Sequence, residues 1–283
     1  MFDKIKKALA DNSEIIELSL SEYFSDYPLS LTLDEAQKYS LLGGGKRIRA
    51  FLVLEFCRIL GGNVEDALPY ACAIEMMHAS SLVHDDMPCM DNDDFRRGKP
   101  STHKRFSETA ALLTGDTLII KAFSVISENH HLDDTTNLKA IKILSSASGD
   151  VGMLGGQAID TLSSKYVHNI DNLICLHSLK TGKLIAASAM LGCLAAGIAE
   201  DDKRYDMAIN YAENLGLSFQ IRDDILDHLS GKTEYNSFLS FMSLEDSIAF
   251  ADTVTNKAIE SIKSFDDGGL LEELAKFLKD REY

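Results

Sequence analysis

The sequence predicts an all-α protein on three observations. Only four prolines occur, and none follows Pro100, whereas Ala, Leu, Lys and Glu are abundant. Because proline is the strongest helix breaker and these four residues are good helix formers, the composition favours helices. Apolar residues recur with helical spacing, and no run alternates for long enough to make a convincing strand. The hydrophobic fraction of 45% is ordinary for a globular chain with a sizeable core.

The expected helices lie between glycine-rich or polar breaks. These breaks fall at residues 43–45, 61–63, 91–100, 129–136, 149–156 and 268–269. The N-terminal segment, residues 1–16, has no apolar region typical of a targeting signal and predicts the start of an amphipathic helix. The most apolar segment, Leu184 to Ala199, is shorter than the ~18 to 20 residues that span a bilayer, so we expect a buried core helix. No linker, repeat or shift in composition divides the chain, which predicts a single domain over residues 1–283.

Charge and cysteine content narrow the class of protein. The formal net charge of −16 repels phosphate backbones and argues against a nucleic-acid partner. The five cysteines are an odd number without CxxC spacing, which indicates reduced thiols rather than a disulfide framework or a zinc site. We therefore expect a cytoplasmic protein with no stable membrane insertion.

Two clusters of aspartates follow apolar helical segments. The first lies just after residues 71–83 and the second lies among apolar residues near position 225; their members are Asp85, Asp86, Asp91, Asp93 and Asp94, and Asp223, Asp224 and Asp227. Carboxylates this close raise one another's pKa unless a cation relieves the repulsion. Mg²⁺ typically takes one or two carboxylates together with substrate phosphate oxygens. A solvated acidic surface is the simpler interpretation of one such cluster, but the apolar neighbours of both favour a shared metal–diphosphate site.

Basic residues accompany the aspartates. The glycine run at 43–45 is followed by Lys46, Arg47 and Arg49, and exposed N–H groups at a helix start together with cations can bind an anion. The run lacks the P-loop pattern and could equally be a capping loop with solvated cations. Arg96 and Arg97, directly after the first aspartate cluster, could hold a second diphosphate.

These motifs resemble those of the trans-prenyl diphosphate synthases, specifically the bacterial farnesyl and plastid-type geranylgeranyl diphosphate synthases. The DDxxxxD form of the first aspartate motif matches Asp85, Asp86 and Asp91, and the RRGKP that follows it matches residues 96–100. The GGKRxR motif matches residues 44–49, although Ala50 stands where a proline is usual. Matches at residues 115–116, 155–160, 180–182 and 219–227 keep the family order, so the resemblance covers about residues 35–230.

The resemblance implies a fold and a reaction. The fold is an isoprenoid-synthase-type bundle of about ten or more antiparallel helices around a deep central cavity, usually in a homodimer. The reaction condenses isopentenyl diphosphate with an allylic diphosphate (dimethylallyl, geranyl or farnesyl) to give farnesyl or geranylgeranyl diphosphate. It is Mg²⁺-dependent, with about three ions around a bound diphosphate and with Mn²⁺ as a substitute.

The resemblance also implies roles for individual residues. The metal ligands would be Asp85, Asp86, Asp91, Asp223, Asp224 and Asp227, and the catalytic set would be Asp85, Asp86, Lys180 and Asp223. The isopentenyl diphosphate site would contain Lys46, Arg49, His78 and Arg97. The allylic diphosphate, or the cation that it forms, would be held by Arg96, Lys180, Thr181 and Gln220.

Product length is implied by residues that precede the first aspartate motif. Related farnesyl synthases often carry an aromatic residue five positions before the first aspartate, where this chain has Ser80 with Ser81 beside it. These small residues leave the cavity open, and Met76 and Met77 lie one helical turn of ~5.4 Å deeper, where they could close it. We therefore expect a geranylgeranyl rather than a farnesyl product, with ordinary core packing of the two methionines as the alternative.

The pattern departs from the family after Asp227. Relatives carry about fifteen more residues there, including a lysine that contacts the allylic diphosphate, and only Lys232 is available here to replace it. The C-terminal segment, Ile248 to Tyr283, predicts helices with no identifiable chemistry. The shortened loop leaves a second interpretation open, a weakly active or non-catalytic subunit that modifies a partner synthase. A terpene cyclase is disfavoured, because the chain has a second DDxxD motif and the cations of an isopentenyl site.

Overall fold

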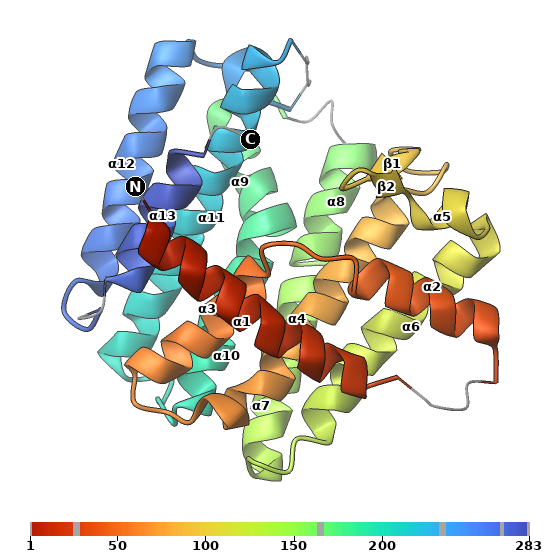
Figure 1. Ribbon diagram of the computed structural model, residues 1–283. Helices are drawn as coiled ribbons and strands as arrows, with labels where there is room; N and C mark the ends of the chain where they lie inside the picture. Colours follow the sequence, from red (N-terminus) through yellow and green to blue (C-terminus); the bar gives the residue numbers. More distant parts are fainter. Residues whose placement is uncertain (1, 25–28, 163–166, 232–235, 267–268, 282–283) are drawn as a thin grey trace.

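The structure, a computed structural model, describes residues 2–24, 29–162, 167–231, 236–266 and 269–281 (Figure 1). Its first half contains α1 (Asp3–Glu22), α2 (Leu31–Leu41), α3 (Ile48–Ile59), α4 (Val64–Asp85), the strands β1 (Phe95–Arg96) and β2 (Lys99–Pro100), α5 (Thr102–Arg105), α6 (Glu108–Ser127) and α7 (Asp134–Ser148). Its second half contains α8 (Met153–Leu162), α9 (Ile170–His177), the π-helix η2 (Ser178–Gly182), α10 (Lys183–Ala195), α11 (Lys203–Leu229), the 3₁₀ helix η3 (Phe238–Ser240), α12 (Leu244–Ile262) and α13 (Leu270–Lys279).

The prediction of an all-α bundle is confirmed. More than ten helices occur among the described residues, and the strands there form only one hairpin with two residues in each strand. Most expected breaks lie at helix starts: the Asn63 side chain caps α4, the Asp133 side chain caps α7, and α13 begins after Gly269. The break expected at residues 149–156 ends early, because α8 begins at Met153 and includes the last two glycines. Gly156 allows close packing of α8 on η2, and Gly155 leaves room for the Asp150 carbonyl of the preceding turn.

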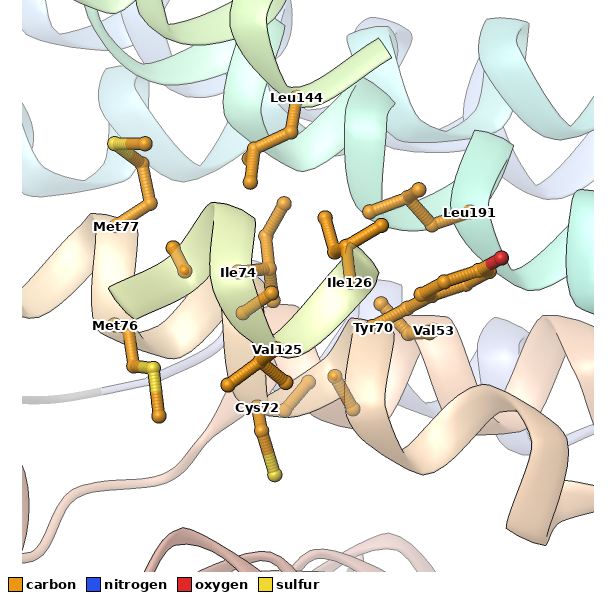
Figure 2. Packing of buried hydrophobic residues seen from close by; sticks show 14 of the residues in the cluster. Val53, Tyr70, Cys72, Ile74, Met76, Met77, Val125, Ile126, Leu144 and Leu191 are labelled. Carbon is orange, nitrogen blue, oxygen red and sulfur yellow. The ribbon is translucent and has the colours of Figure 1, made fainter. Parts of the chain in front are cut away.

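The helix α4 runs through the centre of the bundle (Figure 1) and contacts α3, α6 and α10. Apolar side chains surround it, as expected of a helix that is buried on all sides. Its Tyr70 and Ile74 pack with Val125 and Ile126 of α6 and with Leu191 of α10 (Figure 2). This rigid packing fixes the C-terminal end of α4, which carries the first aspartate cluster.

The apolar segment predicted to be a core helix is buried. It forms α10, which ends at Ala195, and its side chains from Leu184 to Ala189 are almost inaccessible. Of the described helices, α6 alone is long and apolar enough to cross a membrane by length and composition. Its packing against α4 is that of a helix within the bundle.

Candidate active site

A cavity of about 650 Å³ lies at the C-terminal end of α4. The part of the cavity next to the end of α4 is lined by the polar side chains of Asp85, Lys180 and Thr181, and we call it the mouth. The other walls of the cavity are mainly apolar and include Ile119 and Phe123 of α6. The remaining lining residues come from α3, α4, α6, α7, α8 and the turns after α4 and α7. The cavity therefore joins a charged mouth to an apolar interior.

The first aspartate cluster places Asp85 on the cavity lining and the exposed Asp91 next to it. The backbone N–H of Asp91 donates to the carbonyl of Asp85 at 2.9 Å, so the turn after α4 folds Asp91 back toward the helix end. Burial raises the pKa of Asp85 to about 6, with Asp91 adding to the rise and the ammonium of Lys180 opposing it. Burial also raises the pKa of Asp91. The two carboxylates repel each other and Asp85 is half-buried, so a cation would stabilise them.

Asp86 and Arg96 are paired with each other instead of facing the cavity. Asp86 is 3% exposed and accepts a hydrogen bond from Arg96 Nε at 2.8 Å, with a second contact from the same guanidinium. Arg96 also lies 3.3 Å from Asp93. The pair fixes the β1–β2 hairpin to the end of α4. The predicted roles of Asp86 as a metal ligand and Arg96 as an allylic-diphosphate ligand stay predictions.

Lys180 reaches the same mouth from the π-helix η2. The wider π-turn interrupts the helix between α9 and α10, as such turns often do at functional sites. Lys180 Nζ donates to Asp160 of α8 at 2.6 Å, and Asn236 donates to the other oxygen of Asp160 at 2.8 Å. The backbone of η2 comes so close to α8 that a Cβ atom at Gly156 would lie 2.2 Å from the Lys180 nitrogen.

The second aspartate cluster lies on α11. Asp223 and Asp227 share a half-buried face of this helix. Asp224 points inward, is 3% exposed and accepts a hydrogen bond from the Phe238 N–H at 2.8 Å. Gln220 accepts a hydrogen bond from the Thr181 hydroxyl at 3.2 Å, which links α11 to η2. Asp223 is ion-paired with a residue that the sequence did not single out, Arg281.

These donors fit Mg²⁺ in the way that Mg²⁺ binds with a phosphate-bearing substrate. No group of three or more His, Cys, Asp or Glu side chains in the described ranges could hold a metal ion by itself. A site completed by substrate needs only one or two carboxylates, with phosphate oxygens and water as the other ligands. The hard carboxylate oxygens of Asp85 and Asp91, whose proximity raises the pKa of Asp85, meet that requirement.

A group of basic side chains lies at the cavity. Arg49 and His78 line it, and the Nε of Arg49 is buried without a hydrogen-bond partner in the described structure. Burial, and then the charge of Arg49 and Arg97, lowers the pKa of His78 well below its usual value. Burial is also the main cause that lowers the pKa of Arg49 and of Arg97, and these two cations disfavour each other. An anion placed among them would relieve both effects.

Local backbone geometry places Arg97 in this group. Arg97 and Gly98 form the two-residue turn between β1 and β2, with φ of 53° and 75°. Two positive φ values define the type I′ turn that suits a tight hairpin, and the first is unfavourable for a residue with a side chain. The Arg97 guanidinium reaches the carbonyl of Gly44 and so joins the hairpin to the glycine run.

The cations of the glycine-rich segment are divided between structure and site. Arg47 is buried against Glu17, Glu75 and the carbonyl of Leu41, so it stabilises the packing of α1 and α4. Lys46 is exposed and lies 5.2 Å above the ring of Phe277 on α13. The structure therefore brings Arg49, His78 and Arg97 together. Lys46 lies apart from the cavity lining.

The residues predicted to set product length also separate. Ser80, Ser81 and Met77 line the cavity, whereas Met76 is buried in the main core and points away from Met77 (Figure 2). The Ser80 hydroxyl donates to the carbonyl of Met77 at 2.7 Å, so its polar group is already satisfied within α4.

Sequence reasoning missed several cavity or site residues. Ile119 and Phe123 carry no signal beyond the apolar pattern of α6. Asp160 was visible only as part of a motif without an assigned role, and nothing marked Arg281. Lys232, considered as a substitute for the lysine of the shortened loop, lies outside the described residues.

Comparison with known proteins matches this site to one family. The sequence profile of the polyprenyl synthetase family matches residues 31–237, which include both aspartate clusters. The chain belongs to this family. Among its relatives, the geranylgeranyl diphosphate synthase of Cyanophora paradoxa is 38% identical, over 96% of this chain and 95% of that protein. The farnesyl diphosphate synthase of Micrococcus luteus is 37% identical, over 98% of this chain and 99% of that protein.

Solved structures of polyprenyl synthetases share the fold. The crystal structure of an FPP/GFPP synthase from Zymomonas mobilis superposes with a TM-score of 0.89 at 35% identity and covers 100% of both chains. The expected isoprenoid-synthase-type bundle is therefore confirmed, and the relatives bear names of both shorter and longer products.

Proposed function

We propose that this protein is a Mg²⁺-dependent short-chain trans-prenyl diphosphate synthase that condenses isopentenyl diphosphate with an allylic diphosphate. The observation that carries the proposal is the cavity itself. Asp85 and Lys180 occupy its mouth with Asp91 next to them, the half-buried cation Arg49 lines it, and most of its remaining surface is apolar. A substrate with a diphosphate head and a hydrocarbon tail matches each part in turn.

The allylic diphosphate would bind at the mouth. Bound Mg²⁺, held by Asp85, Asp91 and Asp223 with the predicted support of Asp86, Asp224 and Asp227, would supply Lewis-acid stabilisation of the departing diphosphate. Lys180, oriented by Asp160, would donate hydrogen bonds to the same diphosphate as negative charge develops there. The side-chain oxygens of Thr181 and Gln220 would lie beside the allylic cation and stabilise it.

Isopentenyl diphosphate would bind among Arg49, His78 and Arg97, with Lys46 closing over it from the glycine-rich segment. Holding this substrate by its diphosphate aligns its double bond for attack on the allylic cation. The released diphosphate would then take the proton lost from the adjacent carbon. The apolar walls exclude water, which would otherwise quench the cation. No protein nucleophile takes part.

We propose geranylgeranyl diphosphate as the main product. Ser80 and Ser81 leave the cavity open next to the mouth, and Met77 with Phe123 lies deeper along its wall. Ser80→Tyr would place an aromatic ring near the mouth and should shorten the product to farnesyl diphosphate. Unchanged chain length in that variant would remove Ser80 from the residues that limit growth.

We also propose that the enzyme is a cytoplasmic homodimer. Leu112, Leu113 and Ile120 give α6 an exposed apolar surface, which supports a protein contact there. Light scattering during size-exclusion chromatography tests the assembly size.

The function is tested by incubating the purified protein with Mg²⁺, labelled isopentenyl diphosphate and, separately, dimethylallyl, geranyl and farnesyl diphosphate. Dephosphorylated products are sized by chromatography. Asp85→Ala should abolish incorporation, whereas Asp94→Asn should not. Asp94 is an exposed aspartate of the same segment and is paired with Lys104 at 2.8 Å. Failure of the folded protein with every starter would refute an active synthase. That result would support the alternative of a non-catalytic partner subunit, which the shortened loop after Asp227 favours.

A further inference from the structure

Arg281, which follows α13, contacts the second aspartate cluster. Its guanidinium forms an ion pair with Asp223 on α11 and donates to the carbonyl of Phe219 at 3.2 Å. The same group stacks over the Phe219 ring, with 3.9 Å from Cζ to the ring centroid. Figure 1 shows the C-terminal end of the chain beside α11. An arginine more than fifty positions away in sequence thus covers one of the proposed metal ligands.

The contact is fixed from several sides. Arg222 donates two hydrogen bonds, at 3.0 and 2.6 Å, to the Arg281 carbonyl. The Arg281 side chain is only 10% exposed, and its Nε is buried without a hydrogen-bond partner in the described structure. Burial of a guanidinium with one unsatisfied donor costs free energy. The ion pair with Asp223 is therefore the main interaction that offsets this cost.

Both acidic and basic side chains lie near Arg281, and one of the basic ones, Lys46, belongs to the glycine-rich segment. Asp227 lies near enough to favour the charged guanidinium, while Lys46 and Arg222 disfavour it. Lys46 rests on Phe277 of the same C-terminal segment. A further positive charge close to Asp223 would therefore be repelled by Arg281, Arg222 and Lys46.

We propose that Arg281 is a positioning residue that holds the carboxylate of Asp223 and competes with the divalent cation for it. This inference rests on the proposed function, in which Asp223 is a metal ligand. A guanidinium and a divalent cation on one carboxylate repel each other, so each weakens the binding of the other to Asp223. By linkage the effect is reciprocal: loading of the metal site weakens the hold of the C-terminal residues on α11, and loss of Arg281 strengthens metal binding.

The experiment measures Mn²⁺ binding by electron paramagnetic resonance, which reports free Mn²⁺, with inorganic pyrophosphate present and no prenyl substrate. Arg281→Gln should lower the apparent dissociation constant about fivefold, within the range usual for coupled sites. Lys279→Gln is the matched control. It removes a neighbouring ion pair, Lys279 to Asp252 at 2.6 Å, without touching Asp223, and should leave Mn²⁺ affinity unchanged.

A second readout follows the C-terminus itself. In the wild type, Mn²⁺ with pyrophosphate should speed the stepwise removal of residues 283 to 281 by a carboxypeptidase, relative to pyrophosphate alone. Mass spectrometry measures the loss of Arg281. Asp223→Asn should show fast removal in both conditions. Equal rates in the wild type with and without Mn²⁺ would overturn the competition.

The outcomes separate this inference from the proposed function. If Asp223→Asn weakens Mn²⁺ binding but Arg281→Gln leaves it unchanged or weakens it, the competition is wrong and the metal role of Asp223 stands. If Lys279→Gln tightens binding as much as Arg281→Gln, general loosening of the C-terminus is the cause and the competition is again wrong. If Asp223→Asn has no effect on Mn²⁺ binding, the proposed metal role of Asp223 fails first.

Discussion

Replacing Gly156 by alanine should both displace Lys180 and destabilise the fold. A methyl group at this position would lie 2.2 Å from the backbone nitrogen of Lys180 and 2.6 Å from its Cα. Both are backbone atoms, so no side-chain rotation can relieve the overlap. The α8 and η2 backbones must separate by about 1 Å to restore ordinary contact, and the Lys180–Asp160 hydrogen bond of 2.6 Å spans the same gap.

The size of the effect follows from two opposing terms. Overpacking of this kind costs about 1–3 kcal/mol or more, while alanine in place of glycine within a helix gains about 1 kcal/mol. We expect a net loss of up to about 2 kcal/mol, and each kcal/mol lost should lower Tm by about 2–4 °C. Under the proposed function, in which Lys180 binds the departing diphosphate, a displacement of about 1 Å should also lower kcat on the order of 100-fold.

The matched control is Gly182→Ala in the same π-helix. Its nearest neighbour would be the His177 carbonyl oxygen at 3.7 Å, which is ordinary contact, and its φ of −63° suits alanine. This variant should raise stability by about 0.4–1 kcal/mol through the unfolded chain. Thermal unfolding and steady-state kinetics of both variants decide the matter. If Gly156→Ala is as stable and active as Gly182→Ala, close packing of α8 on η2 does not position Lys180.

Three further predictions follow from the burial of individual side chains. Met77→Ala should lengthen the prenyl product by enlarging the cavity while Met76→Ala should not, and chromatography of the dephosphorylated products would contradict this if both behave alike. Burial raises the pKa of Asp85 from 3.8 to about 6, so ionising it opposes folding as pH rises through this window; Asp85→Asn should therefore raise Tm in metal-free buffer above pH 6, and a gain that persisted below about pH 4 would be inconsistent with this cause. Arg47→Met leaves Glu75, which is 2% exposed, buried with one partner lost and should cost about 3–5 kcal/mol by urea unfolding, whereas a loss below about 1 kcal/mol would show that Glu75 finds another partner.

The fold and much of the candidate site could be predicted because their signals are local. Helix-forming composition, the spacing of apolar residues and the side-chain caps at Asn63 and Asp133 all act within a few residues. The aspartate clusters were visible for the same reason, since carboxylates one to six positions apart on a helix end must lie close together.

Other features depend on which helices meet. Asp86 and Asp224 belong to the same motifs as Asp85 and Asp223, yet they face Arg96 and the Phe238 N–H, because rotation of a helix in its packing decides which face is buried. Met76 and Met77 are adjacent in sequence but lie on opposite sides of α4 (Figure 2). Ile119 and Phe123 reach the cavity only because α6 packs along α4.

The sequence by itself therefore determined the class of fold, the reaction family and the residue types that carry charge at the site. Those properties follow from short-range periodicity and from motifs whose members are near neighbours. Only the tertiary structure decided which aspartate lines the cavity, which arginine pairs with Glu17 and Glu75, and that Arg281 contacts Asp223. These outcomes are contacts between segments far apart in the chain, and packing of the helices against one another sets them.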